Sequence, residues 1–458
     1  MKNERLIVVG GVAAGMSGAS RARKLRRDME IIVFEKSGYV SYAMCGMPYF
    51  VADKVKTPES LLFYEAGFFR EKRNIGVFLN HEVTQILPAT KTVVVEDRGS
   101  GKEQTYEYDK LLISTGARPF VPIPEGTVLR GVFILRQLED AIALKGYILS
   151  EKPVAGLIIG GGYIAMEMAE AFSQAGIKVT VVEKMPEILG TMDKEITERV
   201  NEELRRNGVT VIKSDSVARF TERGSRVSGA VLSSGQTVAA DIVLIGAGIR
   251  PNSEMAGDAG VRLEPTGAIE TDAKMETSIP DIFAAGDCTS AHQLVLGRNA
   301  YVPLGTTANK QGRVAGENIA GGDATFKGIV GTSVFKTFDL EVGRTGITEK
   351  EAISEHIDYA TNVIEHISRA HYYPGVSKVL VKLVAAKETG RLLGAQMIGK
   401  EGVVRRIDVF ATAITAGMSV QEITELDLGY APPFGPVNDP VLVAAEQLQK
   451  KVRQEKVA

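Results

Sequence analysis

The residue of this 458-residue chain most suited to chemistry is Cys45, which lies in the segment Ser41-Tyr42-Ala43-Met44-Cys45-Gly46-Met47-Pro48-Tyr49. Pro48 is typical of the first turn of a helix, so we expect Cys45 to face a helix N-terminus. Such a position lowers the pKa of a thiol and raises its reactivity. A lone cysteine is more often a buried, inert side chain, and a neighbouring motif is needed to decide between the two interpretations.

That motif is Gly10-Gly11-Val12-Ala13-Ala14-Gly15, which follows the apolar run 6–9 and precedes a predicted helix that ends near residue 27. A second strand over 31–34 then ends at Glu35, ten residues before Cys45. The same order recurs from residue 157, with Gly160-Gly161-Gly162-Tyr163-Ile164-Ala165 and an acidic residue at Glu183. The acid follows the first glycine by 25 residues in one copy and by 23 in the other. This agreement indicates a repeated βαβ unit.

Each unit has the features of a dinucleotide site. The first glycine allows a tight turn, the next lets the backbone approach a pyrophosphate, and the N–H groups of the helix face the phosphates. The acid is expected to bind the ribose hydroxyls. The alternative is a pair of glycine-rich strand–helix turns with no ligand. The candidate residues are Gly10, Val12 (which replaces the middle glycine), Ala14, Gly15, Glu35 and Lys36 in the first unit and Gly160, Gly162, Tyr163, Ile164, Glu183 and Lys184 in the second.

Two such sites in one chain indicate a tightly held FAD and an exchangeable nicotinamide dinucleotide. Glu183 favours NADH, because a carboxylate suits a free ribose 2′-hydroxyl, whereas Lys184 leaves NADPH open. Two further strand–turn segments, 111–119 and 243–251, are each expected to pass the dinucleotide of their own unit. The turns of these segments contain Thr115, Gly116 and Gly248.

The order of elements predicts an α/β fold with two Rossmann-like dinucleotide-binding domains and a C-terminal α+β domain. A strand over 281–287 ends at Asp287, and the glycine motifs stop near residue 328. Strand-like runs then cover 333–338, 379–385 and 392–398, with helical patterns at 407–416 and 441–451. We expect the FAD-binding domain to cover 1–118 and 250–325, the NAD(P)H-binding domain 119–249 and the C-terminal domain 326–458.

The composition excludes several classes of protein. The chain has 54 Lys and Arg against 56 Asp and Glu, a net charge of −2, and lacks the basic excess of a nucleic-acid binder. No apolar run reaches the roughly 20 residues of a membrane span, and the N-terminus lacks a signal-peptide pattern. We therefore expect a soluble, cytoplasmic protein with no nucleic-acid or membrane partner. Two cysteines cannot build a disulfide scaffold, and we expect no metal site.

The chain resembles the single-cysteine branch of the flavin-dependent pyridine nucleotide-disulfide oxidoreductases over essentially its whole length. The markers are the first glycine motif with Glu35, the Ser-Tyr-x-x-Cys-Gly-x-Pro-Tyr segment, residues 160–167, and residues 277–287 with their Ala-Ala-Gly-Asp ending. Within this branch it is most similar to coenzyme A disulfide reductases and NADH-dependent persulfide or polysulfide reductases, whose C-terminal motifs match residues 372–375 and 430–434.

The resemblance implies roles for the cofactor residues. The first glycine motif and Glu35 would hold the adenosine end of FAD, and Asp287 would bind its ribityl-phosphate side. Tyr163 would cover the nicotinamide pocket beside the flavin, and Glu167 would lie near the flavin ring. The C-terminal domain would be a dimerisation domain that forms a homodimer.

The same resemblance identifies Cys45 as the redox-active residue and Cys288 as a structural one. Relatives of the glutathione reductase type carry a Cys-x4-Cys pair and a C-terminal His-Glu pair, but here no cysteine lies within five residues of Cys45 and no histidine follows His371. The second sulfur must therefore arrive with the substrate. Tyr430 and Tyr372 would reach the substrate pocket of the other subunit and are candidate donors to the leaving sulfur.

A coenzyme A substrate needs cations for its phosphates. Ser17, Arg21 and Lys24 fall on one face of the first helix, Arg73 matches another basic position of the family's coenzyme A site, and Ser41 completes the candidate substrate residues. The alternative is a solvated basic face. Two positions also depart from relatives that carry His and Lys there, which favours smaller polysulfide or persulfide substrates: Asn309 and Asn438.

Three functions therefore compete. The first is NAD(P)H-dependent reduction of coenzyme A disulfide, coenzyme A persulfide or polysulfide through Cys45. The second is an NADH oxidase in which Cys45 cycles through a sulfenic acid. The third is a flavoprotein that relays electrons without thiol chemistry, and the presence of Cys45 argues against it.

Overall fold

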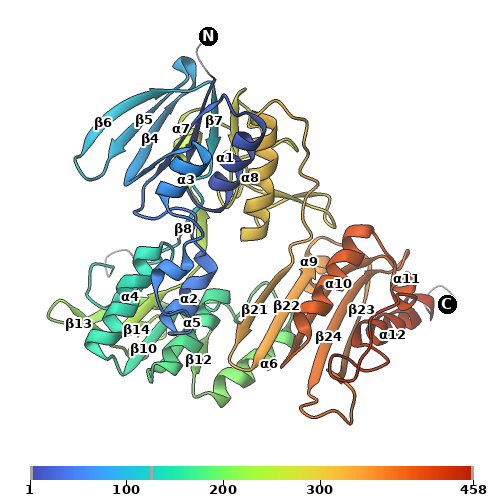
Figure 1. The fold of residues 1–458 in the computed structure, drawn as a ribbon. Helices are drawn as coiled ribbons and strands as arrows, with labels where there is room; N and C mark the ends of the chain where they lie inside the picture. The colour runs from blue at the N-terminus through green and yellow to red at the C-terminus, as the bar shows by residue number, and fades with distance from the viewer. Residues whose placement is uncertain (1–3, 124–126, 455–458) are drawn as a thin grey trace.

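The computed structural model describes residues 4–123 and 127–454, and Figure 1 shows that they form three parts. The first two parts each contain a five-stranded parallel sheet, and the C-terminal part contains a five-stranded antiparallel sheet. This arrangement confirms the predicted α/β fold with an α+β domain at the C-terminus. No helix among the described residues is long and apolar enough to cross a membrane.

The first sheet has the order β18-β7-β1-β2-β3. Its strands are continuous apolar runs because both faces are buried, and Leu6, Ile7 and Val8 have no exposed surface. One face packs against α1 (Ala13–Leu25) and α8 (Gly305–Ile319), and the other packs against β4 and β5 of a small antiparallel sheet. The five strands of the first sheet are β1 (Arg5–Val9), β2 (Glu30–Glu35), β3 (Gly76–Leu79), β7 (Lys110–Ile113) and β18 (Ile282–Ala284). The small antiparallel sheet consists of β4 (His81–Leu87), β5 (Thr92–Asp97) and β6 (Lys102–Glu107).

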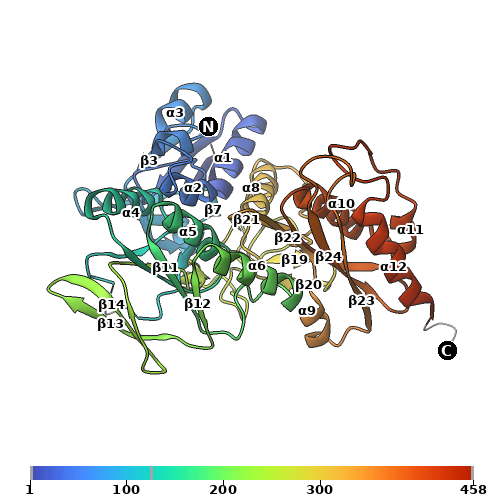
Figure 2. The same ribbon diagram turned by 90° about the horizontal axis from the view of Figure 1, so that it is seen from below.

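The second sheet repeats this plan in the order β12-β11-β10-β16-β9. Helix α5 (Tyr163–Gln174) joins β10 (Ala155–Ile159) to β11 (Lys178–Glu183), as α1 joins β1 to β2. Figure 2 shows α6 (Lys194–Arg206) between this sheet and the C-terminal sheet. The remaining elements are α4 (Leu138–Glu151), β9 (Val132–Ile134), β12 (Thr210–Lys213), β16 (Ile242–Ile245) and the antiparallel strands β13 (Val217–Arg223), β14 (Arg226–Leu232) and β15 (Thr237–Ala239).

A short two-stranded ribbon links the first two parts. Strand β8 (Ala117–Pro119) leaves the first part and pairs antiparallel with β17 (Ile249–Pro251), on which the chain returns. The side chain of Arg118 contacts both the returning strand and Glu254. The chain therefore enters and leaves the second part at this ribbon.

The C-terminal sheet has the order β21-β22-β25-β24-β23. The predicted strands and helices are present, and the last helix buries its apolar face, with Val441, Ala444 and Leu448 fully enclosed. Residues 455–458 of the predicted domain lie outside the described residues. The elements are β21 (Ser333–Thr337), β22 (Leu340–Gly346), α9 (Glu349–Ser354), β23 (Tyr359–Ile367), β24 (Lys378–Ala386), β25 (Leu392–Gly399), α10 (Val403–Ala416), α11 (Val420–Thr424) and α12 (Pro440–Gln454).

Candidate active site

Both glycine turns have the same backbone geometry. Gly10 and Gly160 adopt φ angles of +101° and +102°, a left-handed conformation that glycine reaches without a steric penalty. A Cβ atom at Gly10 would lie 2.3 Å from the carbonyl oxygen of Ser114, and one at Gly160 would lie 2.3 Å from that of Gly246. Glycine is therefore required at both turns, and each turn brings a helix N-terminus to the carboxyl edge of its sheet.

The predicted acidic residues are both held by their glycine motifs. Oε2 of Glu35 accepts the N–H of Gly11 at 2.7 Å, and Oε2 of Glu183 accepts the N–H of Gly161 at 2.6 Å. Each carboxylate is thus fixed at the end of its second strand, beside the helix N-terminus, as a ribose-binding acid requires. The other oxygen of each carboxylate accepts a backbone N–H two residues further on, from Ser37 at 2.9 Å and Met185 at 2.7 Å.

A cavity of about 2790 Å³ extends along both units. It is lined by Val12 and Ala14 at the first turn, by Gly162 and Ile164 at the second, and by Cys45. The glycine turns, the fixed carboxylates and the extended cavity fit FAD at the first unit and NAD(P)H at the second. Lys36 also lines this cavity, whereas Glu183 and the exposed Lys184 lie outside its lining. The described residues contain no cluster that could hold a metal ion.

Cys45 lies in a short 3₁₀ turn, Met44–Gly46, which leads into the five-residue helix α2 (Met47–Val51). Its side chain is open to the cavity, although protein surrounds much of the thiol. The expectation of a lowered pKa is wrong for this structure: burial, followed by the negative charges of Glu167 and Asp287, raises the pKa of the thiol. The positive charge of Arg136 and a backbone hydrogen bond act in the opposite direction but do not offset these effects on the pKa.

Glu167, on the second turn of α5, is a titratable neighbour of Cys45. Burial raises the pKa of its carboxyl group to about 7. Oε1 accepts a hydrogen bond of 3.1 Å from the hydroxyl of Tyr49, which belongs to the same segment as Cys45. Tyr49 is not among the predicted site residues, although its position in the Cys-Gly-x-Pro-Tyr motif is a signal that could have identified it.

Asp287 lies in the cavity wall and is paired with a residue that the sequence did not identify. The guanidinium of Arg136 lies 2.9 Å from its Oδ2, and the hydroxyl of Tyr301 donates to its backbone carbonyl at 2.9 Å. No motif marks Arg136 or Tyr301, because they are brought to Asp287 by the fold.

The predicted turn residues of the two connecting segments also line the cavity. Thr115 donates its hydroxyl to the carbonyl oxygen of Asn252 at 2.5 Å. Gly116 and Gly248 have φ angles of +69° and +110°, and Gly248 accepts the N–H of Phe120 at 2.8 Å. These contacts hold the turns of the two segments next to each other at the ribbon.

Tyr163 begins α5 and contacts two parts of the molecule. Its hydroxyl lies 2.9 Å from Oγ1 of Thr191 and 3.2 Å from Oγ of Ser333 on β21, and its ring centroid lies 5.0 Å from that of Phe335. The tyrosine therefore lies at the cavity wall between the second unit and the C-terminal sheet.

The predicted substrate residues Ser17, Arg21, Lys24, Ser41 and Arg73 all line the cavity. Their charges are not equally available. Arg21 forms an ion pair with Glu317 at 2.5 Å, and Ser17 donates to Asn309 at 2.6 Å. Arg73 donates to Ser20 at 2.8 Å and stacks near three aromatic rings. The charge of Lys24 is exposed to solvent and available to a ligand. The charge of Arg21 is already neutralised by Glu317 of α8.

Tyr372 and Tyr430 lie together on the C-terminal domain, with their hydroxyl oxygens 3.4 Å apart. Both side chains are exposed, at 64% and 46%. Neither of them lines the cavity that contains Cys45. Within one chain, the structure therefore does not bring the tyrosines to the thiol.

Comparison with known proteins identifies the family. Residues 4–312 match the model of the pyridine nucleotide-disulphide oxidoreductases, and residues 332–439 match the dimerisation domain of these proteins. The chain belongs to this family of oxidoreductases, which use FAD and NAD(P)H.

Individual relatives are similar along nearly their whole length. An NAD(P)H coenzyme A polysulfide/persulfide reductase from Pyrococcus horikoshii is 40% identical over 97% of this chain and 98% of the relative. An NADH oxidase from Methanocaldococcus jannaschii is 35% identical over 98% and 99%, and a coenzyme A disulfide reductase from Staphylococcus epidermidis is 31% identical over 95% and 97%. The solved NAD-dependent persulfide reductase from A. fulgidus superposes with a TM-score of 0.94, at 39% identity, over 98% of this chain and 84% of that chain.

Proposed function

We propose that this protein uses NAD(P)H to reduce coenzyme A disulfide, coenzyme A persulfide or polysulfide through FAD and Cys45. The observation that carries the proposal is the single thiol open to a cavity that both dinucleotide units line. Cys288 is fully buried, and its Sγ lies 3.4 Å from the carbonyl oxygen of Ala285. Cys45 therefore has no partner thiol in the chain, and its sulfur partner must be the substrate.

The chemistry at Cys45 takes two steps. The thiolate attacks one sulfur of R–S–S–R, the S–S bond breaks, and a mixed disulfide forms as the first R–S⁻ leaves. The mixed disulfide then accepts two electrons and a proton, which releases R–SH and restores the Cys45 thiolate. The sum is R–S–S–R + NAD(P)H + H⁺ → 2 R–SH + NAD(P)⁺. Bound FAD would carry the two electrons from NAD(P)H. A persulfide substrate would release sulfide in the first step.

Proton transfer during this cycle has candidate donors in the chain. Glu167, with a pKa of about 7, can hold a proton beside Cys45 near neutral pH. The Tyr372 and Tyr430 hydroxyls can protonate the leaving sulfur if they belong to the other subunit of a homodimer. Exposed apolar side chains that follow Tyr430 in the sequence support such an interface, since Phe434 and Val437 are each 70% exposed.

The choice of substrate depends on the basic side of the cavity. Lys24 and Arg73 can bind phosphates of coenzyme A, whereas Arg21 would first have to leave Glu317. We also propose that the FAD-binding domain covers 1–118 and 250–325, the NAD(P)H-binding domain 119–249 and the dimerisation domain 326–458. The β8–β17 ribbon supports the two boundaries near residues 118 and 250.

The decisive test is replacement of the nucleophile in the FAD-loaded enzyme. We expect Cys45→Ser to lower kcat for coenzyme A disulfide and polysulfide by about a thousandfold or more, while NADH still bleaches the flavin absorbance. Cys288→Ala is the matched control and should retain turnover. Full sulfur-dependent turnover in Cys45→Ser would refute the thiol mechanism.

A second candidate function is the NADH oxidase activity of the related archaeal protein. In that case Cys45 would form a sulfenic acid with an oxygen species instead of a mixed disulfide. Rapid NADH consumption in air, with no increase on addition of coenzyme A disulfide or polysulfide, would favour the oxidase.

A further inference from the structure

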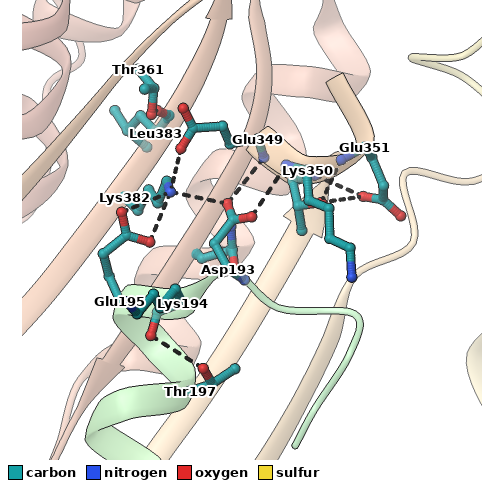
Figure 3. Close-up of polar contacts among 12 residues, drawn as sticks. Asp193, Lys194, Glu195, Thr197, Glu349, Lys350, Glu351, Thr361, Lys382 and Leu383 are labelled. Carbon is teal, nitrogen blue, oxygen red and sulfur yellow. Dashed lines mark hydrogen bonds and ion pairs between the residues drawn. The ribbon is translucent and has the colours of Figure 1, made fainter. Parts of the chain in front are cut away.

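An ion cluster with a buried lysine lies between the second dinucleotide unit and the C-terminal domain (Figure 3). Its centre is Lys382 on β24, whose side chain is only 2% exposed. The ammonium group lies 2.8 Å from Glu195 on α6, 2.6 Å from Glu349 on α9 and 3.3 Å from Asp193. One cation thus contacts three carboxylates, and two of them come from the nicotinamide-binding unit.

The charges of this cluster are interdependent. Burial alone would lower the pKa of Lys382, but the hydrogen bonds with Glu195 and Glu349 outweigh this effect and raise the pKa. Without the ammonium group, Asp193 would be a carboxylate buried close to two others, which is a costly arrangement. Lys382 therefore holds together carboxylates from separate elements that would otherwise repel one another.

Asp193 connects the second unit to the C-terminal part. Its carboxylate accepts Nε2 of Gln396 at 2.6 Å and the backbone N–H of Glu349 at 3.0 Å and of Lys350 at 3.3 Å. Its own N–H donates to Oε1 of Gln396 at 2.8 Å. Asp193 is thereby fixed to the C-terminal sheet, although it belongs to the second unit.

The short segment that ends at Asp193, residues 188–193, runs from the cluster to the second glycine turn. At its start, the N–H of Leu189 donates to the carbonyl oxygen of Gly161 at 2.8 Å. In the middle of the segment, the carbonyl oxygen of Thr191 accepts a hydrogen bond from Arg344 on β22. The hydroxyl of Thr191 lies 2.9 Å from the hydroxyl of Tyr163. Movement of the 188–193 segment would therefore move a hydrogen-bond partner of Tyr163.

We propose that Lys382 is a positioning residue for NAD(P)H: the ion cluster fastens the 188–193 segment to the C-terminal domain, and this segment holds Tyr163 at the wall of the nicotinamide site. The inference rests on the proposed place of Tyr163 beside the nicotinamide. The residue that influences dinucleotide binding would then lie away from the dinucleotide, on a strand of the dimerisation domain.

Binding of NAD⁺ to the oxidised, FAD-loaded enzyme tests the proposal by calorimetry, without turnover. We expect Lys382→Met to raise the Kd of NAD⁺ by about five-fold and Lys382→Arg to restore most of the affinity. Thr191→Val, which keeps the side-chain shape but removes the hydroxyl, should raise the Kd in the same direction by a smaller factor. Stopped-flow reduction of the flavin should require correspondingly more NADH for half-maximal rate.

Two comparisons separate positioning from a general loss of stability. Lys378→Met is the matched control, because Lys378 lies on the same strand and pairs with Glu365 but is 75% exposed; it should leave the Kd unchanged. Glu349→Gln removes one charge from the cluster and replaces Lys382→Met if that variant does not fold. An unchanged Kd for NAD⁺ in both Glu349→Gln and Thr191→Val would overturn the proposal, even if the melting temperature fell.

The proposed sulfur chemistry is tested separately, by mixing the reduced enzyme with coenzyme A disulfide. The rate at which coenzyme A disulfide reoxidises the enzyme should change less than about two-fold in the Lys382 and Thr191 variants. A wild-type enzyme that does not react with coenzyme A disulfide would contradict the proposed function but would leave the NAD⁺ titration valid.

Discussion

The two βαβ units have the same turn but differ in what covers it. Gly10 and Gly160 have nearly equal φ angles, and the acids Glu35 and Glu183 accept the same N–H of their motifs. In the first unit α1 packs along α8, whereas in the second α5 packs against α2 and β21, and Ile164 at its start is 41% exposed. We call the first unit, whose helix has a second helix along it, the closed unit, and the second, whose helix start is partly exposed, the open unit; this difference suits a retained FAD and an exchangeable nicotinamide.

Close packing of α1 on α8 depends on glycine. A Cβ atom at Gly316 would lie 2.2 Å from the carbonyl oxygen of Gly18, and one at Gly312 would lie 2.2 Å from that of Ala14. The two helices therefore meet at backbone distance along this seam. No glycine of α5 provides such a seam, since that helix contains none.

Equivalent positions of the two helices also carry different side chains. Ala13 and Ser17 of α1 correspond to Tyr163 and Glu167 of α5. In the first unit these positions are small and pack near α8, whereas in the second they place a phenol and a titratable acid on the cavity wall. At these two positions, only the second unit therefore places a phenol and a titratable acid beside the cavity.

The loops that follow the two acids show a further correspondence. Ser41 and Leu189 each lie six residues after the acid, have φ angles of +53° and +50°, and donate their N–H to the carbonyl of the second motif glycine. From this common anchor the first loop continues to Cys45 and the second to Asp193. The same loop geometry leads to the thiol in one unit and to the ion cluster in the other.

The largest effect should come from adding a side chain beside the first glycine turn. A Cβ atom at Gly15 would lie 1.9 Å from the carbonyl oxygen of Gly10, so Gly15→Ala must displace the turn that we propose holds FAD. We expect a protein that purifies with less than about a tenth of the wild-type flavin absorbance, or that fails to fold. Ala165→Gly, at the matching position of the second unit, should retain flavin and lose only about 1 kcal/mol of stability. Equal flavin loss in both variants would contradict the division into a closed and an open unit.

The two acids should separate the roles of the units by affinity. Because a hydrogen bond to a charged group contributes about 1.5–3 kcal/mol, Glu183→Gln should raise KM for NADH about tenfold or more and leave the flavin content unchanged. Glu35→Gln should lower the retention of FAD during dialysis and leave KM for NADH of the loaded enzyme near the wild-type value. Steady-state kinetics and flavin content measure both. The assignment of the sites would be wrong if the two phenotypes were exchanged.

The smallest expected effect concerns Glu167 and pH. Burial raises its pKa to about 7, and its negative charge above that pH raises the pKa of Cys45. Glu167→Gln never gains this charge, so its Cys45 thiolate fraction should be higher, and alkylation by iodoacetamide at pH 8 about two- to three-fold faster. Tyr49→Phe removes the hydrogen bond that lowers the pKa of Glu167, so the acid should titrate at higher pH. Identical alkylation profiles in all three proteins would exclude this coupling.

Much of the fold and of the cofactor sites could be predicted because their signals are local. The glycine turns, the two acids and the Cys45 segment are short motifs that specify both backbone and chemistry. Arg136 and Lys382 could not be found this way, because each meets its partners only after segments distant in sequence pack together. Arg21 shows the same limitation: its place on the α1 face was predicted, but the neutralising Glu317 lies 296 residues away.

The error about the pKa of Cys45 has a similar origin. A nearby helix start can be read from Pro48, but the desolvation of the thiol and the charges of Glu167 and Asp287 depend on the tertiary structure. The helix itself has only five residues, so its dipole is small compared with a full-length helix.

The β8–β17 ribbon gives the second dinucleotide unit an entry strand and an exit strand that lie side by side. These strands are paired residue by residue, from Ala117 with Pro251 to Pro119 with Ile249. A unit of different dinucleotide preference could therefore be spliced in at these two points without changing the strand order of the first sheet, provided that it kept the packing against α2 and the C-terminal sheet. The same arrangement is what an ancestral gene insertion would leave behind: one copy of a duplicated fold placed inside a loop of the other.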